Sequence, residues 1–438
     1  MTTHTPTLDI AIIGAGIAGL TAAIALRKHP LVNVVVYDKA SVLREIGASI
    51  ALGPNGLRTL QRLGLDDIIA ENGFRGVERV GMIYRHWQTN EVLGTDGDEA
   101  GHEELHRTAR FHRGHLHGAL LSHVPAESVK LGKKISSIDT ENEGVTLGFE
   151  DGTSAKADLV IGADGIRSGV RTLFVPNFPL NWSGWTAFRS IFPASLTKSI
   201  PNLPQDATHW WSPKTTFFSS PLRKNLCTIV GGIYLDPALT PLENGTWDRP
   251  ADVKILRDTY EMWNPVVKAL SEVTPEIRVY PNLACLQRLE RWVFGGGRVV
   301  LVGDAAHAHG GAFATGGSLA IEDAYALSLA LFSVLPALPV TTTASSSSGV
   351  MKPGPQELEG ALRLYEDIRK PHAERLLAKV HAANELKLGR LREGRVESDE
   401  ELRERAGRGS DTAWLHEYDV VRAFEEVVKR RSADDAKL

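Results

Sequence analysis

The start of the chain carries a glycine pattern that few folds accommodate. Residues 14–19 read Gly-Ala-Gly-Ile-Ala-Gly, a G-x-G-x-x-G that follows an apolar, β-branched run at 8–13. An Ala- and Leu-rich stretch at 17–27 and a second apolar run at 32–37 complete the pattern of strand, helix and strand. A helix that begins at such a turn offers backbone N–H groups and a partial positive charge to a phosphate. The pattern therefore predicts a Rossmann-like dinucleotide site.

Each glycine of this motif has its own task in that prediction. Gly14 allows the tight turn, Gly16 lets a pyrophosphate approach the backbone, and Gly19 lets the helix pack close to the strand. Asp38 ends the second apolar run, where its carboxylate can accept a hydrogen bond from a ribose hydroxyl. The motif alone does not distinguish FAD from NAD, so a plain NAD dehydrogenase stays open at this point.

The composition narrows the class of protein. The chain has 438 residues, of which 42% are hydrophobic and 23% charged, as in soluble globular proteins of two or three domains. A formal net charge of −4 predicts neither a nucleic-acid partner nor an anionic membrane partner. No apolar run reaches the roughly 18 residues of a membrane-spanning helix. The only cysteines, Cys227 and Cys285, exclude a disulfide framework and suit a reducing compartment.

The two ends of the chain bear on localisation. The first nine residues are short and polar and lack the basic segment and long apolar run of a signal peptide, which predicts a cytoplasmic protein. Residues 436–438 read Ala-Lys-Leu, a loose variant of the Ser-Lys-Leu peroxisomal signal. Import into the peroxisome is therefore the alternative.

Changes in composition along the chain predict its domains. Residues 174–286 are rich in Trp, Pro and alternating apolar residues, which predicts an inserted antiparallel-sheet domain for the substrate. The nucleotide-binding pattern fills residues 1–173, of which 75–95 can join the substrate sheet, and resumes at 287–383. A Ser- and Thr-rich stretch between Pro336 and Pro355 predicts a surface loop, and the charged residues 384–438 predict a helical tail packed on the outside.

Two later motifs extend the opening fingerprint. Residues 157–168 read ADLVIGADGIRS, in which a short apolar strand ends in a Gly-Ala-Asp-Gly turn. Residues 301–307 read LVGDAAH, and Ile-Glu-Asp-Ala follows at 321–324. With these blocks in order, the chain resembles the class A flavoprotein monooxygenases, which include para-hydroxybenzoate and salicylate hydroxylases. It looks most like the salicylate-hydroxylase-like branch that also holds hydroxylases of fungal phenolic polyketides, over residues 8–376.

The resemblance implies a fold, a cofactor and a reaction. The fold is α/β, a Rossmann-like FAD-binding domain like that of para-hydroxybenzoate hydroxylase, with the inserted antiparallel sheet and C-terminal helices. FAD is the bound cofactor, and NADH or NADPH visits as the co-substrate. The reaction implied is hydroxylation of a small phenolic or salicylate-like ring with O2, through a flavin hydroperoxide. The partners are thus the aromatic substrate, O2 and NAD(P)H, and the protein is a monomer or a small homo-oligomer.

Residue by residue, the resemblance also implies contacts with FAD. Asp38 would bind the adenosine ribose with backbone from Ala51 nearby, and Arg113 would be the family's FAD-contacting arginine. Asp304 would bind the ribityl and pyrophosphate region, and Gly316 and Gly317 would offer N–H groups to the flavin ring. Asp164 belongs to a motif linked to both FAD and the pyridine nucleotide. Gly311 stands where the family usually has a proline, so the loop near the flavin loses a fixed φ.

The candidate catalytic residues are Arg189 and Tyr234. Arg189 lies where related phenol hydroxylases carry an arginine that binds a phenolate, and a guanidinium there would lower the pKa of the phenol. Some relatives pair it with a tyrosine near 217–221, where this chain has Phe217-Phe218-Ser219-Ser220-Pro221. Tyr234 is the nearest tyrosine on a neighbouring expected strand and is therefore the candidate substitute.

A metal site and two other functions are alternatives to this prediction. His307 and His309 lack a third ligand at a useful spacing, so no metal site is predicted. A flavin-dependent halogenase or reductase on the same fold is a second hypothesis, although the halogenase motif W-x-W-x-I-P is missing. A non-catalytic flavin-binding protein is the third, since a fold alone does not establish an activity.

Overall fold

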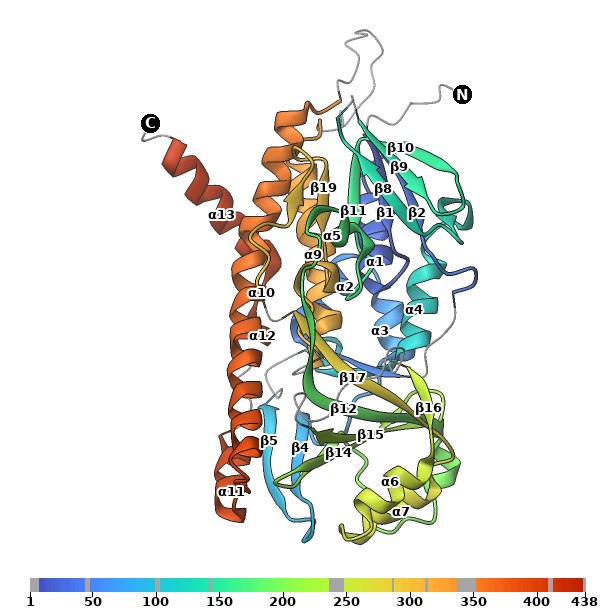
Figure 1. Ribbon diagram of the computed structural model, residues 1–438, viewed down its shortest axis with the longest axis vertical. Coiled ribbons are helices and arrows are strands. Elements are labelled where there is room, and N and C mark those ends of the chain that lie inside the picture. Colours follow the sequence, from blue (N-terminus) through green and yellow to red (C-terminus); the bar gives the residue numbers. More distant parts are fainter. Residues whose placement is uncertain are drawn as a thin grey trace.

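The structure is a computed structural model with two sheet layers, one above the other along the long axis of the molecule (Figure 1). It describes residues 8–43, 48–98, 103–141, 144–235, 248–285, 287–311, 314–336, 352–408 and 413–435. Within these ranges, no helix combines the length and the apolar character that crossing a bilayer requires.

The upper layer is a six-stranded, mostly parallel sheet. Its strands, in spatial order, are β18 (Val293–Phe294), β19 (Val299–Leu301), β11 (Leu159–Gly162), β1 (Leu8–Ile13), β2 (Val32–Tyr37) and β7 (Val129–Lys130). Only the β18–β19 pair is antiparallel. Strands β19, β11 and β1 are short apolar runs whose residues are almost all buried, because a strand covered on both faces needs no polar alternation. The βαβ unit expected from the opening sequence is thus present, in register from Leu8 opposite Val32.

Helices and two small sheets surround this layer. Every residue of α1 (Ile17–Leu26) is buried, and α1 packs against α9 (Gly316–Phe332). The other helices near this sheet are α2 (Pro54–Arg62), α3 (Asp66–Asn72), α4 (Arg113–Ser122), α5 (Gly169–Phe174) and α8 (Asp304–His307), with 3₁₀ turns at Glu104–His106 and Ala126–Ser128. The small sheets are β8 (Ile135–Asp139) with β9 (Val145–Phe149) and β10 (Ser154–Ala157), and β3 (Ser49–Leu52) with β6 (Ala109–His112).

The lower layer is an eight-stranded sheet. In spatial order its strands are β16 (Arg249–Ala251), β17 (Ile277–Cys285), β12 (Leu180–Pro193), β15 (Leu226–Tyr234), β14 (Thr215–Leu222), β13 (Thr208–Trp211), β4 (Val80–His86) and β5 (Val92–Asp98). Neighbours are antiparallel except β13 and β4, which run parallel. The sheet therefore combines strands from residues 80–98 with strands from 180–285.

One face of the lower sheet packs against helices and forms a hydrophobic core of its own. Helices α6 (Val253–Tyr260) and α7 (Pro265–Val273) cover this face, and a 3₁₀ turn spans Ala194–Thr197. Sequence reasoning expected only strands in this region, but α7 has a strong helix start, since Asn264 caps it and Pro265 is its first residue. Phe188, Trp210 and Phe217 point into this core. Because side chains alternate along a strand, their neighbours in sequence point to the opposite face.

That opposite face looks toward the upper layer. Thr228 of β15 donates a hydrogen bond to Ser49 of β3 across the junction, at 3.0 Å. The long helix α10 (Pro355–Arg392) runs along the side of the molecule and joins the two layers, and α11 (Asp399–Gly407) packs against β5 (Figure 1). The expected boundary at residue 384 falls inside α10, which continues there without a break.

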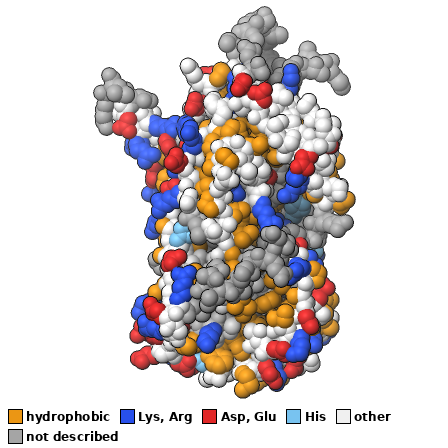
Figure 2. Space-filling view, in the orientation of Figure 1, with side chains coloured by type: hydrophobic (Ala, Val, Ile, Leu, Met, Phe, Trp, Pro, Cys, Tyr) orange, Lys and Arg blue, Asp and Glu red, His pale blue; other side chains and the backbone are white. Residues whose placement is uncertain are grey.

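Two more helices complete the C-terminal part, α12 (Ala413–Glu417) and α13 (Val420–Asp435). Charged side chains of both signs lie mainly along the borders of the face drawn in Figure 2, with a band of hydrophobic side chains between them. This view shows no large patch of one charge, in keeping with the small formal net charge of −4.

Candidate active site

The glycines of the opening motif differ in what surrounds them. Gly14 has φ +109°, and a Cβ atom there would lie 2.5 Å from the carbonyl oxygen of Ala163. A Cβ on Gly19 would lie 1.9 Å from the carbonyl oxygen of Gly14. Gly16, in contrast, has nothing within 4 Å of its Cβ position. The protein itself needs Gly14 and Gly19, whereas the space beside Gly16 is open for another molecule.

That open space belongs to a pocket of about 160 Å³. It is lined by Ala15, Gly16, Asp38, Ala40, Leu43, Arg113, Gly114 and His117. The Asp38 carboxylate accepts hydrogen bonds from the backbone N–H groups of Ala15, at 2.7 Å, and Ala40, at 2.8 Å. The structure therefore brings Gly16, Asp38 and Arg113, three of the residues expected at the nucleotide, to one pocket.

A second part of the site lies where the Gly-Asp motif begins α8. Gly303 has φ +60°, and the carboxylate of the exposed Asp304 that follows has no hydrogen-bond partner within the described residues. Burial lowers the pKa of the Arg113 guanidinium, and the negative charge of Asp304 opposes that shift. Asp304 and Arg113 are thus near each other although 191 positions (304 − 113) separate them in sequence.

The start of α9 forms the third part. Leu319 donates its N–H to Thr315, so the N–H groups of Gly316 and Gly317 precede the first hydrogen bond of the helix. A Cβ on Gly317 would lie 2.7 Å from the side chain of Ile50, the neighbour of Ala51 on β3. The helix start and β3 are therefore in close contact, and the expected residues Ala51, Gly316 and Gly317 lie together.

The inward face of the lower sheet carries Arg189. Its guanidinium lies 5.2 Å from the centre of the Tyr280 ring, and its Nε has no hydrogen-bond partner within the described residues. Burial lowers the pKa of Arg189, the Tyr280 hydroxyl opposes that shift, and Arg113 reinforces it. Arg189 is therefore an arginine without a carboxylate partner in the described part of the chain, and it faces the same region as Arg113.

Aromatic side chains surround Arg189 on this face. By strand register they are Tyr84, Trp185, His209, Trp211, Phe218, Tyr234 and Tyr280. Several of these rings are in contact, for example Tyr84 with Trp211 at 4.3 Å between centroids and Trp185 with Tyr234 at 6.4 Å. An apolar aromatic wall with a few polar groups is the usual lining of a small-molecule site.

Comparisons with known proteins agree with this geometry. The sequence model of the FAD-binding domain family matches residues 7–225 and 271–338, more than half of the chain. The chain is 30% identical to 6-hydroxynicotinate 3-monooxygenase of Bordetella bronchiseptica over 85% of this chain and 90% of that protein. The chain belongs to the FAD-dependent aromatic hydroxylases. It is also 28% identical to a salicylate hydroxylase of Pseudomonas putida, over 96% of this chain and 94% of that one.

A solved structure shares the fold of this hydroxylase. The structure of a salicylate hydroxylase substrate complex superimposes with a TM-score of 0.76 at 24% identity, over 96% of this chain and 98% of that one. The expected fold, a para-hydroxybenzoate-hydroxylase-like FAD-binding domain with an antiparallel sheet and C-terminal helices, is therefore confirmed. The enzyme is an FAD-dependent monooxygenase, and the open space at Gly16, the pocket beside it and the unpaired Asp304 carboxylate fit FAD.

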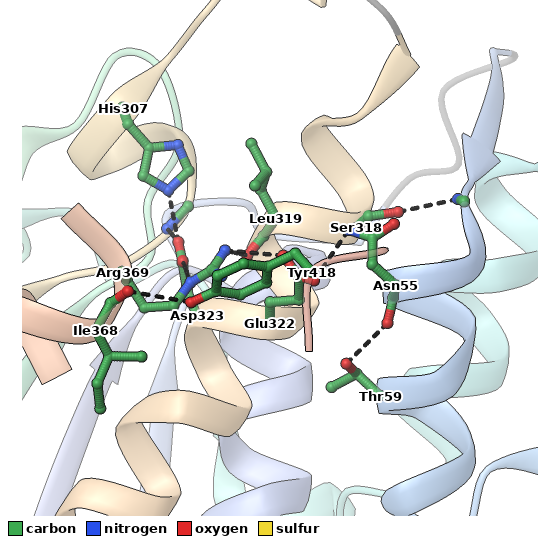
Figure 3. Close-up of polar contacts among 12 residues, drawn as sticks. Asn55, Thr59, His307, Ser318, Leu319, Glu322, Asp323, Ile368, Arg369 and Tyr418 are labelled. Atoms are coloured by element: carbon green, nitrogen blue, oxygen red, sulfur yellow. Dashed lines mark hydrogen bonds and ion pairs between the residues drawn. The ribbon is translucent and has the colours of Figure 1, made fainter. Parts of the chain in front are cut away.

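A buried ionic network lies beneath these parts of the enzyme (Figure 3). Arg369 of α10 donates to Glu322 at 2.9 Å and to Asp323 at 2.8 Å, and all three side chains are fully buried. Asp323 also accepts a hydrogen bond from His307, at 2.6 Å, and one from the N–H of Gly303, at 2.8 Å. The network, which we call the Arg369 network, thus ties the Gly-Asp loop to α9 and α10.

The charges of the Arg369 network depend on one another. Burial alone would raise the pKa of Asp323, but His307 and Arg369 lower it below its usual range. Burial raises the pKa of Glu322 to about 7, against the opposing effect of Arg369 and of the hydrogen bond from Asn55. Glu322 and Asp323 belong to a motif that the sequence revealed, whereas no sequence pattern marked Arg369. It was missed because its partners lie 46 and 47 residues earlier in the chain.

Two expected residues have different surroundings from those a ligand contact suggests. The Asp164 carboxylate accepts hydrogen bonds from the Ser168 hydroxyl and the N–H groups of Gly169 and Val170, so it caps α5. Gly311, at the family's usual proline, has φ +71°, which a proline ring does not permit. The loop therefore has a conformation that the usual proline would prevent.

Tyr234 does not meet Arg189. Arg189 is opposite Val230 in the sheet, and Tyr234 lies four residues further along β15, about 13 Å away along the strand. Tyr280, which sequence reasoning did not single out, is the tyrosine that lies against Arg189. Among the described residues, no group of three or more His, Cys, Asp or Glu side chains could hold a metal ion.

Proposed function

We propose that this enzyme hydroxylates a small phenolic or salicylate-like ring, at the expense of NAD(P)H and O2. One oxygen atom of O2 enters the ring, the other leaves as water, and NAD(P)H supplies the two electrons required. FAD, when bound, supplies the redox chemistry that joins these reactants. The coverage of the salicylate hydroxylase relative supports placing the chain in the salicylate-hydroxylase-like branch, which also includes hydroxylases of fungal phenolic polyketides.

The cofactor is held, in this proposal, by the parts of the site described above. The pyrophosphate would lie on the loop of Gly14, Gly16 and Gly19, and Asp38 would accept a hydrogen bond from the adenosine ribose. Asp304 would hold the ribityl region with Arg113 beside it. Ala51, Gly316 and Gly317 would support the flavin ring through backbone contacts, and Asp164 would shape the loop before α5 through the hydrogen bonds of its carboxylate.

Arg189 is the observation that carries the proposal. Its guanidinium has no carboxylate partner in the described residues, and it lies on an aromatic face that looks toward the FAD-binding layer. A positive charge there stabilises a phenolate more than a phenol, so it lowers the pKa of the substrate hydroxyl. A phenolate ring is richer in electrons, which favours attack by an electrophilic oxygen. Arg189 would therefore both orient and activate the ring.

The surrounding wall excludes water from the same space. Trp185, Phe218 and Tyr280 offer apolar ring surface, and exclusion of water strengthens the interaction between Arg189 and an anionic oxygen. The eight-stranded sheet is accordingly proposed as the substrate-binding part of the enzyme.

The test starts with the absorption spectrum of the purified protein and the flavin released on denaturation. NADH and NADPH oxidation is then measured with phenols and salicylates, with ¹⁸O2 and mass spectrometry of the products. Oxidation stimulated by one ring, with one ¹⁸O atom in its product, is the expected result. NAD(P)H oxidation that no ring stimulates would favour a reductase, and a product halogenated in the presence of chloride or bromide would favour a halogenase.

A further inference from the structure

The C-terminal part of α10 reaches the inward face of the lower sheet. Lys387 of α10 places its Nζ 2.6 Å from the hydroxyl oxygen of Tyr234 and 4.5 Å from the centre of its ring. No carboxylate within the described residues pairs with Lys387. It differs in this from its neighbour Arg390, which pairs with Glu397.

The aromatic face near Lys387 is electropositive. His209 lies on this face in register with Arg189, three strands away. Burial, then the charges of Lys387, Arg405 and Arg110, depress its pKa to about 3. Two of these cations lie over rings of the same face, Arg405 over Trp211 at 4.1 Å and Arg110 over Phe218 at 5.7 Å.

Three carboxylates of the described residues lie beside this face, and all three already have partners. Glu397 accepts two hydrogen bonds from Arg405, Asp96 accepts one from Tyr84, and Asp248 accepts from Tyr280 and Arg278. Lys387 and Arg189 therefore stand as two cations without carboxylate partners on one aromatic face. About 13 Å of strand β15 separates the residues beside them, which exceeds the span of one benzene ring.

We propose that Lys387, together with the Tyr234 hydroxyl, binds an anionic group of the substrate at the end of the aromatic face remote from Arg189. The inference rests on the proposed function and narrows its substrate class. The preferred substrate is then an extended phenol, with two rings or a ring and a side chain, that carries a carboxylate or a second phenolate at its far end. α10 lies outside the residues matched by the FAD-binding domain family, so the residue that confers this selectivity comes from a segment that the family model does not cover.

The test measures binding to the FAD-loaded enzyme through the change in flavin absorption. The probes are 4′-hydroxybiphenyl-4-carboxylate and its neutral counterpart 4-phenylphenol. The wild-type enzyme is expected to bind the carboxylate at least about tenfold more tightly, the usual contribution of a hydrogen bond to a charged group. Lys387→Met should weaken binding of the carboxylate by about tenfold and leave 4-phenylphenol within about twofold. Lys387→Arg should keep most of the preference.

The matched control is Lys268→Met, the same change at an exposed lysine of α7 on the other side of the sheet. FAD content and the thermal midpoint of each variant confirm that it is folded. Equal weakening of both probes by Lys387→Met, or a wild-type enzyme without preference for the carboxylate, would overturn the inference. Failure of the proposed function looks different, because the FAD-loaded wild type would then bind neither probe and no ring would stimulate NAD(P)H oxidation.

Discussion

Two regions of the enzyme each contain a buried or half-buried arginine, and they differ in whether that arginine has a carboxylate partner. In the Arg369 network, Arg369 is fully buried and pairs with both Glu322 and Asp323. On the aromatic face of the lower sheet, Arg189 lies over the Tyr280 ring with no carboxylate partner in the described residues. A buried charge without a partner is expensive, so an unpaired arginine persists only where it keeps access to a ligand or to solvent.

The difference separates residues that hold the fold from residues that are free to act on a ligand. Removal of Arg369 leaves two carboxylates buried without their cation, whereas removal of Arg189 leaves no ion unpaired. The same substitution of an arginine should therefore lower stability in one region and lower activity in the other.

The largest effect is expected for Arg369→Met. Breaking a buried ion pair from one side costs about 3–5 kcal/mol, because the remaining charge stays uncompensated. We expect a drop of that size in the free energy of unfolding, measured by urea denaturation, with loss of FAD because the Gly-Asp loop is tied to the network through Asp323. Arg363→Met, at a partly exposed arginine of the same helix, is the control. A change below about 1 kcal/mol at Arg369 would mean that the network does not hold the fold.

The glycine loop allows the same comparison between two positions three residues apart. Gly19→Ala places a Cβ 1.9 Å from a backbone oxygen, so α1 must shift and the apoprotein should lose about 1–3 kcal/mol. Gly16→Ala has open space, so the apoprotein should keep its thermal midpoint while the Kd for FAD rises at least about tenfold. Titration of apoprotein with FAD, followed by fluorescence quenching, measures the second effect. Unchanged FAD affinity in Gly16→Ala would place the pyrophosphate elsewhere.

Arg189→Ala should leave FAD bound and lower turnover. A hydrogen bond to a charged group contributes about 1.5–3 kcal/mol, so kcat/KM for the best ring should fall by about 10- to 150-fold. The thermal midpoint should stay close to that of the wild type, in contrast to Arg369→Met. Arg189→Lys, which keeps the charge without the planar fork, should recover part of the loss. Wild-type turnover in Arg189→Ala would remove Arg189 from the mechanism.

Sequence reasoning succeeded where a local pattern carries the information. The β-α-β opening and the two later motifs are runs of adjacent residues, and they correctly indicated FAD and the fold. The alternating strands of 174–286 indicated a sheet, but not the helices α6 and α7 within it or the parallel pairing of β4 with β13.

The candidate site was harder to predict where its residues meet only after folding. Tyr280 lies against Arg189 from the neighbouring strand, although the two residues are 91 positions (280 − 189) apart in sequence. Lys387 reaches Tyr234 from a helix 153 residues later, and the charged tail from residue 384 suggested a solvated surface helix instead. Alternation along one strand gives the side on which a residue lies, but not which distant element covers it.

The smallest effect tests whether the aromatic face is as electropositive as its cations suggest. Burial and the charges of Lys387, Arg405 and Arg110 lower the pKa of His209 from 6.5 to about 3 in the folded protein. Below pH 6.5 the unfolded chain binds a proton at His209 that the folded protein does not, so stability is full above that pH and falls as the pH drops toward 3. Between pH 7 and 5 the free energy of unfolding should fall by about 1–2 kcal/mol more in the wild type than in His209→Gln. Equal pH dependence in both proteins would show that His209 takes up its proton in the folded state. The imidazole would then be hydrated and the cations of this face screened, since burial is the largest cause of the lowered pKa. The electrostatic difference between this face and the paired Arg369 network would disappear.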